Sequence, residues 1–303
     1  MGKIAFVFPG QGSQFVGMGK DIYENNTLAK QEYDKIFENL SFDLKTPMFD
    51  GPEEILKKTK YTQPAIVAMS LILDKLLKSK GINPDFVAGH SVGEYAAIGS
   101  AGFLNLDEAV KLTSFRGEVM NEIAEKVNGG MAAIIGMPAN KIQEILMTVP
   151  GVIEAVNFNE PKQTVIAGEK EAIEKACEIL KENGARRAMP LAVSGPFHSS
   201  LMKPAGEKLR KEIENYTIKD TSIKLVANTT ADFISTGKEL KEEIYNQSFG
   251  PVKWVDTIER LKENGVETIY EIGPGKVLSG LIRKIDKSLK VININSLSAI
   301  DNL

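Results

Sequence analysis

A serine lies between two glycines in the segment Gly-His-Ser-Val-Gly at residues 89–93. The pattern Gly-x-Ser-x-Gly is typical of a sharp strand-to-helix turn that presents a nucleophilic serine, and its glycines leave room for close backbone approach. The five residues alone are a weak signal, because ordinary loops also contain them. Here an apolar run at 84–88 precedes the turn and a helix-forming segment at 94–98 follows it. The sequence therefore predicts a strand, a turn and a helix around a nucleophilic Ser91.

A serine nucleophile needs a base that accepts its proton, and the chain has two histidines, His90 and His198. Because His90 is the neighbour of Ser91, its side chain should point away from the serine, and we expect a structural role for it. His198 lies in a loop before a predicted helix whose apolar residues recur at every fourth position. An ordinary surface histidine is the alternative, but the serine turn favours His198 as the general base.

Acyl chemistry on a serine also needs two backbone N–H groups that point at one oxyanion. The N–H of Val92, directly after the serine, is the expected first donor. The Gly-rich segment at residues 8–13, which follows a strand-like run, offers Gln11 between two glycines as the second. As a nucleotide-binding loop this segment is poor, because it lacks the third glycine of a dinucleotide fingerprint and the Lys-Ser/Thr of a P-loop.

Arg116 lies on the inward face of a predicted helix, one turn before Met120. A buried arginine needs an anionic partner, because an unpaired buried charge is too costly to keep. An internal salt bridge is the simpler interpretation from spacing alone. The functional alternative is that Arg116 clamps a substrate carboxylate in bidentate geometry.

The composition is that of a globular protein. The 303 residues are 43% hydrophobic and 25% charged, and the net charge of −3 gives no reason to expect nucleic acid as a partner. With Cys177 as the single cysteine, no internal disulfide can form, and a Cys/His metal cluster is not expected. The apolar run at 4–8 is too short for a signal peptide, and the apolar segment 64–77 is too short and too charged to span a membrane. We therefore expect a cytoplasmic protein that does not bind membranes.

Strand-like and helix-like segments alternate along most of the chain, which predicts an α/β fold with a parallel sheet. The expected strands of this sheet are residues 4–8, 86–88, 223–227 and 268–272, with helices at 64–77, from 106 onwards and at 252–263. The middle of the chain has a different order of predicted elements. They are strand 131–136, helix 140–148, strands 152–157 and 164–167, helix 170–182 and strand 186–193. This βαββαβ order predicts a ferredoxin-like subdomain at 129–193, inserted into a larger domain made of 1–128 and 194–303.

Several segments match, in order, the motifs of one family. They are Phe-Pro-Gly-Gln-Gly-Ser-Gln at 8–14, Gly-His-Ser-Val-Gly-Glu at 89–94, Arg116, Gly-Pro-Phe-His-Ser at 195–199, Asn-Gln at 246–247 ahead of Pro-Val at 251–252, and Glu-Ile-Gly-Pro-Gly-Lys-Val-Leu at 271–278. As a set they resemble the malonyl-CoA:acyl-carrier-protein transacylases of bacterial-type fatty-acid synthesis, over nearly the whole chain. The resemblance implies an α/β-hydrolase-like domain that carries a ferredoxin-like subdomain, in agreement with the order of predicted elements.

The resemblance also implies roles for individual residues. Ser91 is implied as the nucleophile that forms a malonyl ester, and His198 as the base and then the acid. The N–H groups of Gln11 and Val92 are implied as the oxyanion donors. Gln247 is implied to orient His198 through its backbone carbonyl, so that the site is a Ser-His dyad without an acidic third member.

Three further residues are implied to bind the substrate. Arg116 pairs with the free malonyl carboxylate, with Met120 on the same helix face. Phe197 resembles the residue that malonyl-selective members carry beside the base. An acetyl group would leave the guanidinium unpaired, and a site built for a polar partner can reject an analogue that lacks it by roughly 10⁴-fold. The implied reaction is a ping-pong transfer from malonyl-CoA to acyl carrier protein, without a metal or redox cofactor.

The carrier protein is acidic in this family, so a basic docking surface is expected on the chain. Arg186 and Arg187, near the end of the subdomain, and Arg283 and Lys284, near the C-terminus, are the candidates. For any one of these pairs a solvated charged surface is the simpler interpretation.

Other functions stay open at this point. A serine esterase or thioesterase would use the same turn, and carboxylates that could orient its histidine exist between Ser91 and His198. A malonyltransferase of a polyketide-type pathway would share the chemistry. A non-catalytic carrier-binding protein is disfavoured by the intact Ser91, His198 and Arg116. The resemblance implies a monomer.

Overall fold

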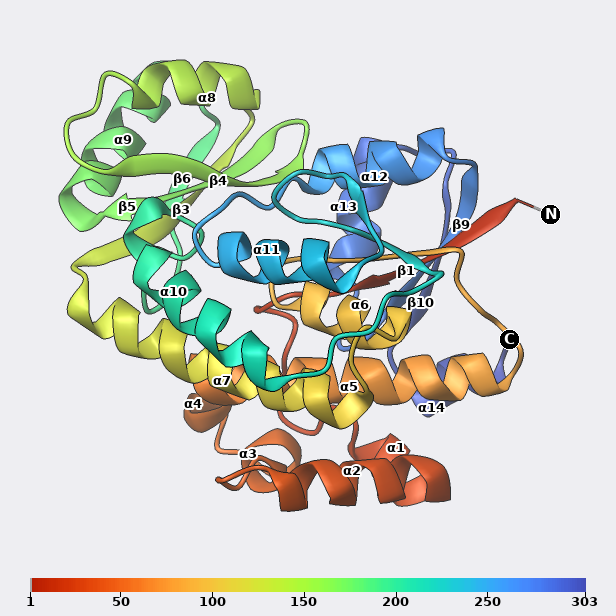
Figure 1. Cartoon of the computed structure of the whole chain (residues 1–303). Helices are drawn as coiled ribbons and strands as arrows, with labels where there is room; N and C mark the ends of the chain where they lie inside the picture. The colour runs from red at the N-terminus through yellow and green to blue at the C-terminus, as the bar shows by residue number, and fades with distance from the viewer. Residues whose placement is uncertain (1) are drawn as a thin grey trace.

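The computed structural model describes residues 2–303, and Figure 1 shows two sheets with helices around them. The elements follow in chain order as β1 (Lys3–Phe8), α1 (Lys20–Asn25), α2 (Thr27–Asn39), α3 (Lys45–Phe49), α4 (Glu53–Leu56), α5 (Thr59–Ser79), β2 (Phe86–Gly89), α6 (Gly93–Ala101), α7 (Leu106–Lys126), β3 (Gly129–Ile135), α8 (Ala139–Leu146), β4 (Ile153–Glu160), β5 (Gln163–Glu169), α9 (Lys170–Glu182), β6 (Arg187–Pro190), α10 (Lys203–Glu212), β7 (Lys224–Val226), β8 (Phe233–Ile234), α11 (Gly237–Gln247), α12 (Trp254–Glu263), β9 (Val266–Ile272), α13 (Val277–Ile285), β10 (Lys290–Ile294) and α14 (Leu297–Asp301).

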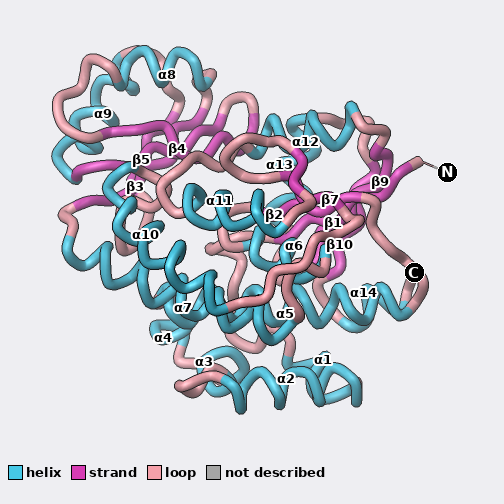
Figure 2. Tube along the Cα trace, viewed as in Figure 1, coloured by secondary structure: helices cyan, strands magenta, loops and turns pink. Residues whose placement is uncertain are grey.

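The larger sheet has the strand order β10-β9-β1-β2-β7-β8, and its neighbours pair in parallel except for the short edge strand β8. Alternate residues of β1 face opposite sides. Phe6 and Phe8 pack with α5 and α6 on one face, whereas Ala5 and Val7 pack with α12 and α13 on the other. A strand that is buried on both faces reads as a continuous apolar run, which is why 4–8 is apolar throughout. Figure 2 shows the sheet enclosed between these helices.

The smaller sheet is antiparallel, with the order β4-β5-β3-β6, and α8 and α9 cover one of its faces (Figure 1). Its other face packs against the C-terminal half of α7, whose N-terminal half belongs to the core of the larger sheet. Helix α7 therefore links the two cores, and Arg116 lies near its middle. A capping box between Asn105 and Glu108 fixes the start of this helix.

The structure confirms the predicted α/β class, with a parallel sheet and a separate antiparallel sheet, and the βαββαβ order of the middle region. The division into domains at 129 and 193 stays a prediction. Strand β6 is shorter than the 186–193 expected. The helix expected at 252–263 begins at Trp254, because Val252 is extended and exchanges backbone hydrogen bonds with Val156 and Phe158 of β4. The sequence did not indicate the edge strands β8 and β10, and it predicted mixed helices after the Gly-rich turn without giving bounds for α1 to α4. Among the described residues, no helix combines the length and apolar character needed to cross a membrane.

The turn between β2 and α6 is packed so closely that two of its glycines have no room for a side chain. A Cβ on Gly89 would lie 2.0 Å from the carbonyl carbon of Gly93, and one on Gly93 would lie 2.1 Å from the carbonyl oxygen of Phe8. Both neighbours are backbone and cannot rotate away. The glycines of the motif are therefore required by the approach of α6 to the ends of β1 and β2.

We expect Gly93→Ala to destabilise the protein by at least about 1–3 kcal/mol, because the added methyl overpacks a backbone contact. Gly280→Ala is the matched control, since nothing lies within 4 Å of a Cβ built at this helical position. Gly280→Ala should leave stability unchanged or raise it by up to about 1 kcal/mol through helix propensity. Urea unfolding of both variants measures the difference. Equal unfolding free energies for the two would contradict this account of the turn.

Candidate active site

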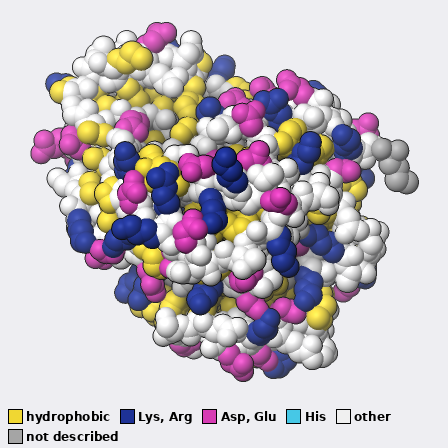
Figure 3. Space-filling model, viewed as in Figure 1, with side chains coloured by type: hydrophobic (Ala, Val, Ile, Leu, Met, Phe, Trp, Pro, Cys, Tyr) yellow, Lys and Arg dark blue, Asp and Glu magenta, His cyan; other side chains and the backbone are white. Residues whose placement is uncertain are grey.

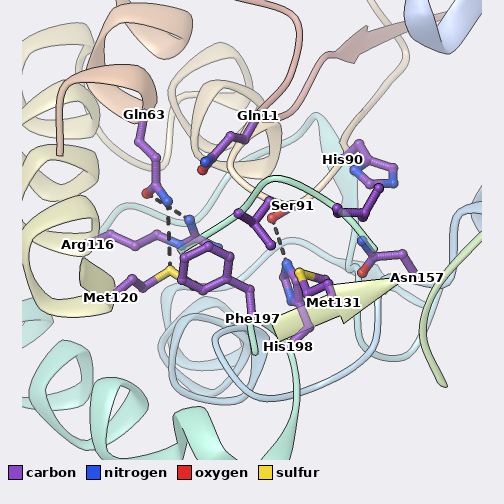
Figure 4. A pocket seen from close by; sticks show the side chains of 12 residues that line it. Gln11, Gln63, His90, Ser91, Arg116, Met120, Met131, Asn157, Phe197 and His198 are labelled. Carbon is purple, nitrogen blue, oxygen red and sulfur yellow. Dashed lines mark hydrogen bonds between the residues drawn. The ribbon is translucent and has the colours of Figure 1, made fainter. Parts of the chain in front are cut away.

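Ser91 and His198 meet at the carboxyl end of β2, as Figure 4 shows. The Ser91 Oγ lies 2.7 Å from His198 Nε2. Both residues have left-handed backbones, with φ of 52° and 67°. Such a conformation costs on the order of 1–3 kcal/mol in a residue other than glycine and persists only where its surroundings enforce it. The predicted pairing of these two side chains is present in the structure.

The other ring nitrogen of His198 faces two backbone carbonyls. Nδ1 lies 2.9 Å from the Gln247 oxygen and 3.1 Å from the Gly250 oxygen. Because carbonyls only accept, Nδ1 carries the proton and Nε2 keeps a lone pair for the Ser91 hydroxyl. The carbonyls thus hold the imidazole in the tautomer and orientation that a general base needs, without a carboxylate.

The environment of His198 disfavours its protonated form. The side chain is 3% exposed. Burial first, and then the positive charge of Arg116 and the nearby His90, lower the pKa of His198 to about 3. The imidazole is therefore neutral at physiological pH and ready to accept a proton. Burial also lowers the pKa of His90, whose Nε2 lies 2.7 Å from Asn159 Oδ1 and whose ring points away from Ser91, as predicted (Figure 4).

Arg116 is fully buried and is held by two carboxamides. Its Nη1 donates to Gln63 Oε1 at 2.7 Å, and its Nη2 donates to Gln247 Oε1 at 2.9 Å. Its Nε has no hydrogen-bond partner, and the guanidinium carbon lies 5.2 Å from the centre of the Tyr95 ring. Within residues 2–303 the guanidinium forms no ion pair, so the internal salt bridge that spacing alone favours is wrong.

Two buried carboxyl groups, Glu94 and Glu243, lie behind the serine turn, and neither forms an ion pair with Arg116 in residues 2–303. Burial first, and then the proximity of Glu243, hold the pKa of Glu94 well above its usual range. The Glu94 carboxyl accepts the Asn228 N–H at 3.0 Å, and Glu243 accepts the Thr229 N–H at 3.0 Å. Within residues 2–303 the Arg116 guanidinium therefore has neutral hydrogen-bond partners and no ion-pair partner. The site therefore holds a buried cation that is suited to an incoming anion.

Gln247 joins the parts of the site. The sequence predicted a role for its backbone carbonyl, and the structure places that carbonyl on His198. The side chain adds two contacts that the sequence did not indicate. Its Oε1 accepts from Arg116, and its Nε2 donates to the Ser91 carbonyl at 2.7 Å. Gln247 thus contacts the base His198, the guanidinium of Arg116 and the backbone of Ser91.

A cavity in front of Ser91 brings the predicted substrate-binding residues together. Arg116, Met120 and Phe197 line it, with Gln11 on the opposite side (Figure 4). In residues 2–303 neither the Gln11 N–H nor the Val92 N–H has a hydrogen-bond partner within the protein, as expected for donors that await an oxyanion. A second cavity shares four lining residues with the first, namely Gln11, His90, Asn157 and Leu191.

The predicted docking residues lie outside the first cavity. Arg186 and Arg187 are exposed beside β6, and Lys284 is exposed on α13, where its ammonium lies 3.4 Å from a carboxylate oxygen of Glu160. On the face in Figure 3, basic and acidic side chains are interspersed. The chain from β6 to Leu191 and the helix α13 both contribute residues to the second cavity.

Sequence reasoning missed two residues of the site entirely. Gln63 is a buried polar residue directly before the apolar part of α5, and Asn228 follows directly on a predicted strand. A buried polar side chain needs a partner, and the carboxyl ends of parallel strands meet at one edge of a sheet. These two signals could have indicated Gln63 and Asn228.

Comparison with known proteins gives a consistent result. Residues 5–298 match the model of the acyl transferase domain family. A malonyl CoA-acyl carrier protein transacylase of Bacillus subtilis is 44% identical over 99% of this chain and 96% of its own length, and one of Haemophilus influenzae is 40% identical over 99% and 97%. Among solved structures, an acyl carrier protein S-malonyltransferase of Vibrio cholerae is 39% identical over 99% of both chains, with a TM-score of 0.95. A malonyl transacylase solved in complex with its type II PKS acyl carrier protein is 38% identical over 99% of this chain and 98% of its own, also with a TM-score of 0.95.

We expect the reactivity of Ser91 to be nearly independent of pH between about pH 5 and pH 8. The neutral imidazole is the reactive form. Since the pKa of His198 is depressed to about 3, reactivity is kept above that value and lost only as the pH falls through it. The rate of labelling by a fluorophosphonate probe, followed by intact-protein mass spectrometry, measures this. Ser91→Ala should take up no label. A fall in rate with a midpoint near 6.5, the ordinary pKa of histidine, would contradict the expectation.

Proposed function

The chain belongs to the acyl transferase domain family, and we propose that it transfers a malonyl group from malonyl-CoA to the pantetheine thiol of acyl carrier protein, by way of a malonyl ester on Ser91. The single observation that carries the substrate assignment is Arg116, a buried and uncompensated cation in the cavity of the Ser91-His198 pair. Such a cavity suits an acyl group that ends in a carboxylate.

The first half-reaction acylates the serine. The Ser91 Oγ attacks the thioester carbon of malonyl-CoA while its proton passes to His198 Nε2. The oxyanion that forms is held by the N–H groups of Gln11 and Val92, which need no reorganisation to receive it. The carbon–sulfur bond then breaks, and Nε2 returns the proton to the sulfur of CoA. Arg116 holds the far carboxylate throughout.

The second half-reaction reverses these roles. The pantetheine thiol of the carrier gives its proton to His198 Nε2, and its sulfur attacks the ester carbon. The ester carbon–oxygen bond breaks, and the proton passes to the Ser91 Oγ. Malonyl carrier protein leaves, and the free enzyme is restored. Acyl exchange between a thioester and an ester transfers neither electrons nor a metal-bound group, which supports a reaction without a cofactor.

Substrate binding also acts on the base. The charge of Arg116 is one of the causes that lower the pKa of His198. A malonyl carboxylate on the guanidinium would cancel part of this charge, so the imidazole would become a stronger base when the correct substrate is bound. An acetyl group brings no charge and would leave the base weak. Selectivity would thus act on the rate of the chemical step as well as on binding.

The alternative of a serine hydrolase is not favoured by the surroundings of the base. His198 is oriented by the carbonyls of Gln247 and Gly250 where hydrolases use a carboxylate. We propose further that the protein acts as a monomer in the cytoplasm and supplies fatty-acid elongation.

For the carrier protein we propose a docking surface formed by Arg186, Arg187 and Lys284. Arg186 and Arg187 lie in the segment that leads through β6 to Leu191, and Lys284 lies on α13 with Val277; Leu191 and Val277 line the second cavity. A pantetheine arm that enters beside these residues would reach Ser91 through the part that the two cavities share. Positive charge at the mouth suits an acidic carrier and would raise its association rate.

The first experiment is intact-protein mass spectrometry after brief incubation with malonyl-CoA. We expect a malonyl adduct on the wild type and none on Ser91→Ala. Arg116→Ala should acylate with malonyl-CoA about 10²- to 10⁴-fold more slowly, because it loses the partner of the carboxylate. Its rate with acetyl-CoA should be unchanged or higher, because loss of the Arg116 charge raises the pKa of His198. Release of free malonate without an adduct would indicate a hydrolase. An unchanged preference for malonyl-CoA in Arg116→Ala would contradict the assigned substrate.

Charge reversal tests the docking surface. The triple variant Arg186→Glu, Arg187→Glu, Lys284→Glu should transfer malonyl to the carrier about tenfold more slowly at low salt and acylate from malonyl-CoA at nearly the normal rate. The triple variant Lys211→Glu, Lys219→Glu, Lys238→Glu is the matched control, since these three lysines are exposed and their segments contribute no residue to either cavity. Stopped-flow measurement of each half-reaction gives the comparison. If the test variant and the control slow transfer to the carrier equally, the carrier docks on another part of the surface.

A further inference from the structure

Asn228 is fully buried and follows two residues after the end of β7. Its side chain forms two short hydrogen bonds with the serine turn. Oδ1 accepts the Ser91 N–H at 2.8 Å, and Nδ2 donates to the Gly89 carbonyl at 2.6 Å. Its own backbone is tied as well, because its N–H donates to Glu94 Oε1 at 3.0 Å and its carbonyl accepts the Lys253 N–H at 2.9 Å. These backbone hydrogen bonds therefore fix the position from which the Asn228 carboxamide extends.

The two side-chain bonds have the pattern of a parallel sheet. In a parallel pair, one residue donates to the carbonyl before its partner residue and accepts the N–H after it. The carboxamide of Asn228 does the same around His90, since it contacts the Gly89 carbonyl and the Ser91 N–H. The last regular pair between β2 and β7 is Ala88 with Val226. The side chain of Asn228 thus extends the ladder past the point where the strands separate.

This extension acts at the residue whose backbone is strained. The ladder between β2 and β7 ends at Ala88, so the N–H of the left-handed Ser91 has no strand partner, and an N–H without a partner is costly away from water. An asparagine supplies the needed donor and acceptor on one short side chain. An aspartate has two acceptors and would face the Gly89 carbonyl with an oxygen. A serine or alanine is too small to reach both groups.

On the other side of Ser91, the Nε2 of Gln247 donates to the Ser91 carbonyl. The peptide groups before and after the serine are therefore each fixed by a carboxamide. The second of these peptides carries the Val92 N–H, and the Cα between them carries the Oγ that meets His198. A small rotation of this backbone would move the nucleophile and the oxyanion donor together.

We propose that Asn228 is a positioning residue for acyl transfer: it holds Ser91 in the left-handed conformation in which Oγ meets the base and the Val92 N–H faces the oxyanion. The proposal rests on the proposed function of Ser91 as the acyl carrier. Asn228 touches neither the substrate nor His198 and acts through the backbone of the serine alone. The binding of the malonyl carboxylate by Arg116 does not depend on it.

The variants Asn228→Asp, which keeps the shape, and Asn228→Ala, which removes both bonds, test the proposal. Intact-mass titration with malonyl-CoA counts the sites able to react, and kcat is expressed per such site. We expect kcat to fall about 10- to 100-fold, as for a misplaced nucleophile, with KM for malonyl-CoA changed less than about threefold. A residue with only a structural role would lower the unfolding free energy and leave kcat per competent site unchanged.

Asn293→Ala is the matched control. This asparagine, in β10 of the same sheet, donates to the Gly275 carbonyl at 3.0 Å, away from the serine. The Asn293→Ala variant should be less stable than the wild type and keep the wild-type kcat. A kcat per competent site within twofold of the wild type in Asn228→Asp would overturn the proposal, and so would failure of Asn228→Asp to fold, which would assign the carboxamide to the fold. An absence of any adduct on the wild type would overturn the proposed function instead, and the inference with it.

Discussion

The buried charge of Arg116 is the constraint on which the rest of the site depends. A buried guanidinium must be solvated by hydrogen-bond acceptors, and it stays available to a substrate carboxylate only if no internal carboxylate pairs with it. The structure meets both conditions within residues 2–303, since the oxygens of Gln63 and Gln247 hold the two ends and the guanidinium forms no ion pair. The two carboxamides also fix the direction of the remaining N–H groups. A carboxylate in the cavity can therefore complete a set of contacts that the protein leaves incomplete.

The same charge determines what kind of base the site can have. A carboxylate behind His198 would be drawn to the guanidinium and would remove the reason for a substrate anion to bind. Backbone carbonyls orient the imidazole without bringing a full charge, and the structure has two of them. The cost is a weak base, with the pKa of His198 at about 3. A Ser-His pair without an acid is thus the arrangement that fits a site whose selectivity depends on an uncompensated cation.

The sequence could predict those features that one local pattern determines. The Gly-x-Ser-x-Gly turn, the start of α7 at residue 106 and the βαββαβ order each follow from neighbouring residues, and the structure has all three. The pairing of Ser91 with His198 was predictable because the chain offers a single second histidine. What was missed depends on contacts between distant segments. Gln63, Asn228 and the side-chain contacts of Gln247 were not indicated, and these residues reach the site from separate helices or strand ends. The extended Val252, expected in a helix, is likewise explained by its pairing with β4.

The position of the site at the ends of the strands explains how a strained turn is maintained. Strands β1, β2 and β7 are neighbours in the sheet, and their carboxyl ends deliver Gln11, Ser91 and Asn228 to one edge. Register within the sheet is fixed by burial on both faces, so these three residues cannot slip relative to one another. The left-handed backbone of Ser91 costs on the order of 1–3 kcal/mol, which is small beside the burial of the apolar strands behind it. Precision at the nucleophile is therefore a property of the large core, whereas the choice of substrate rests on the few groups around Arg116.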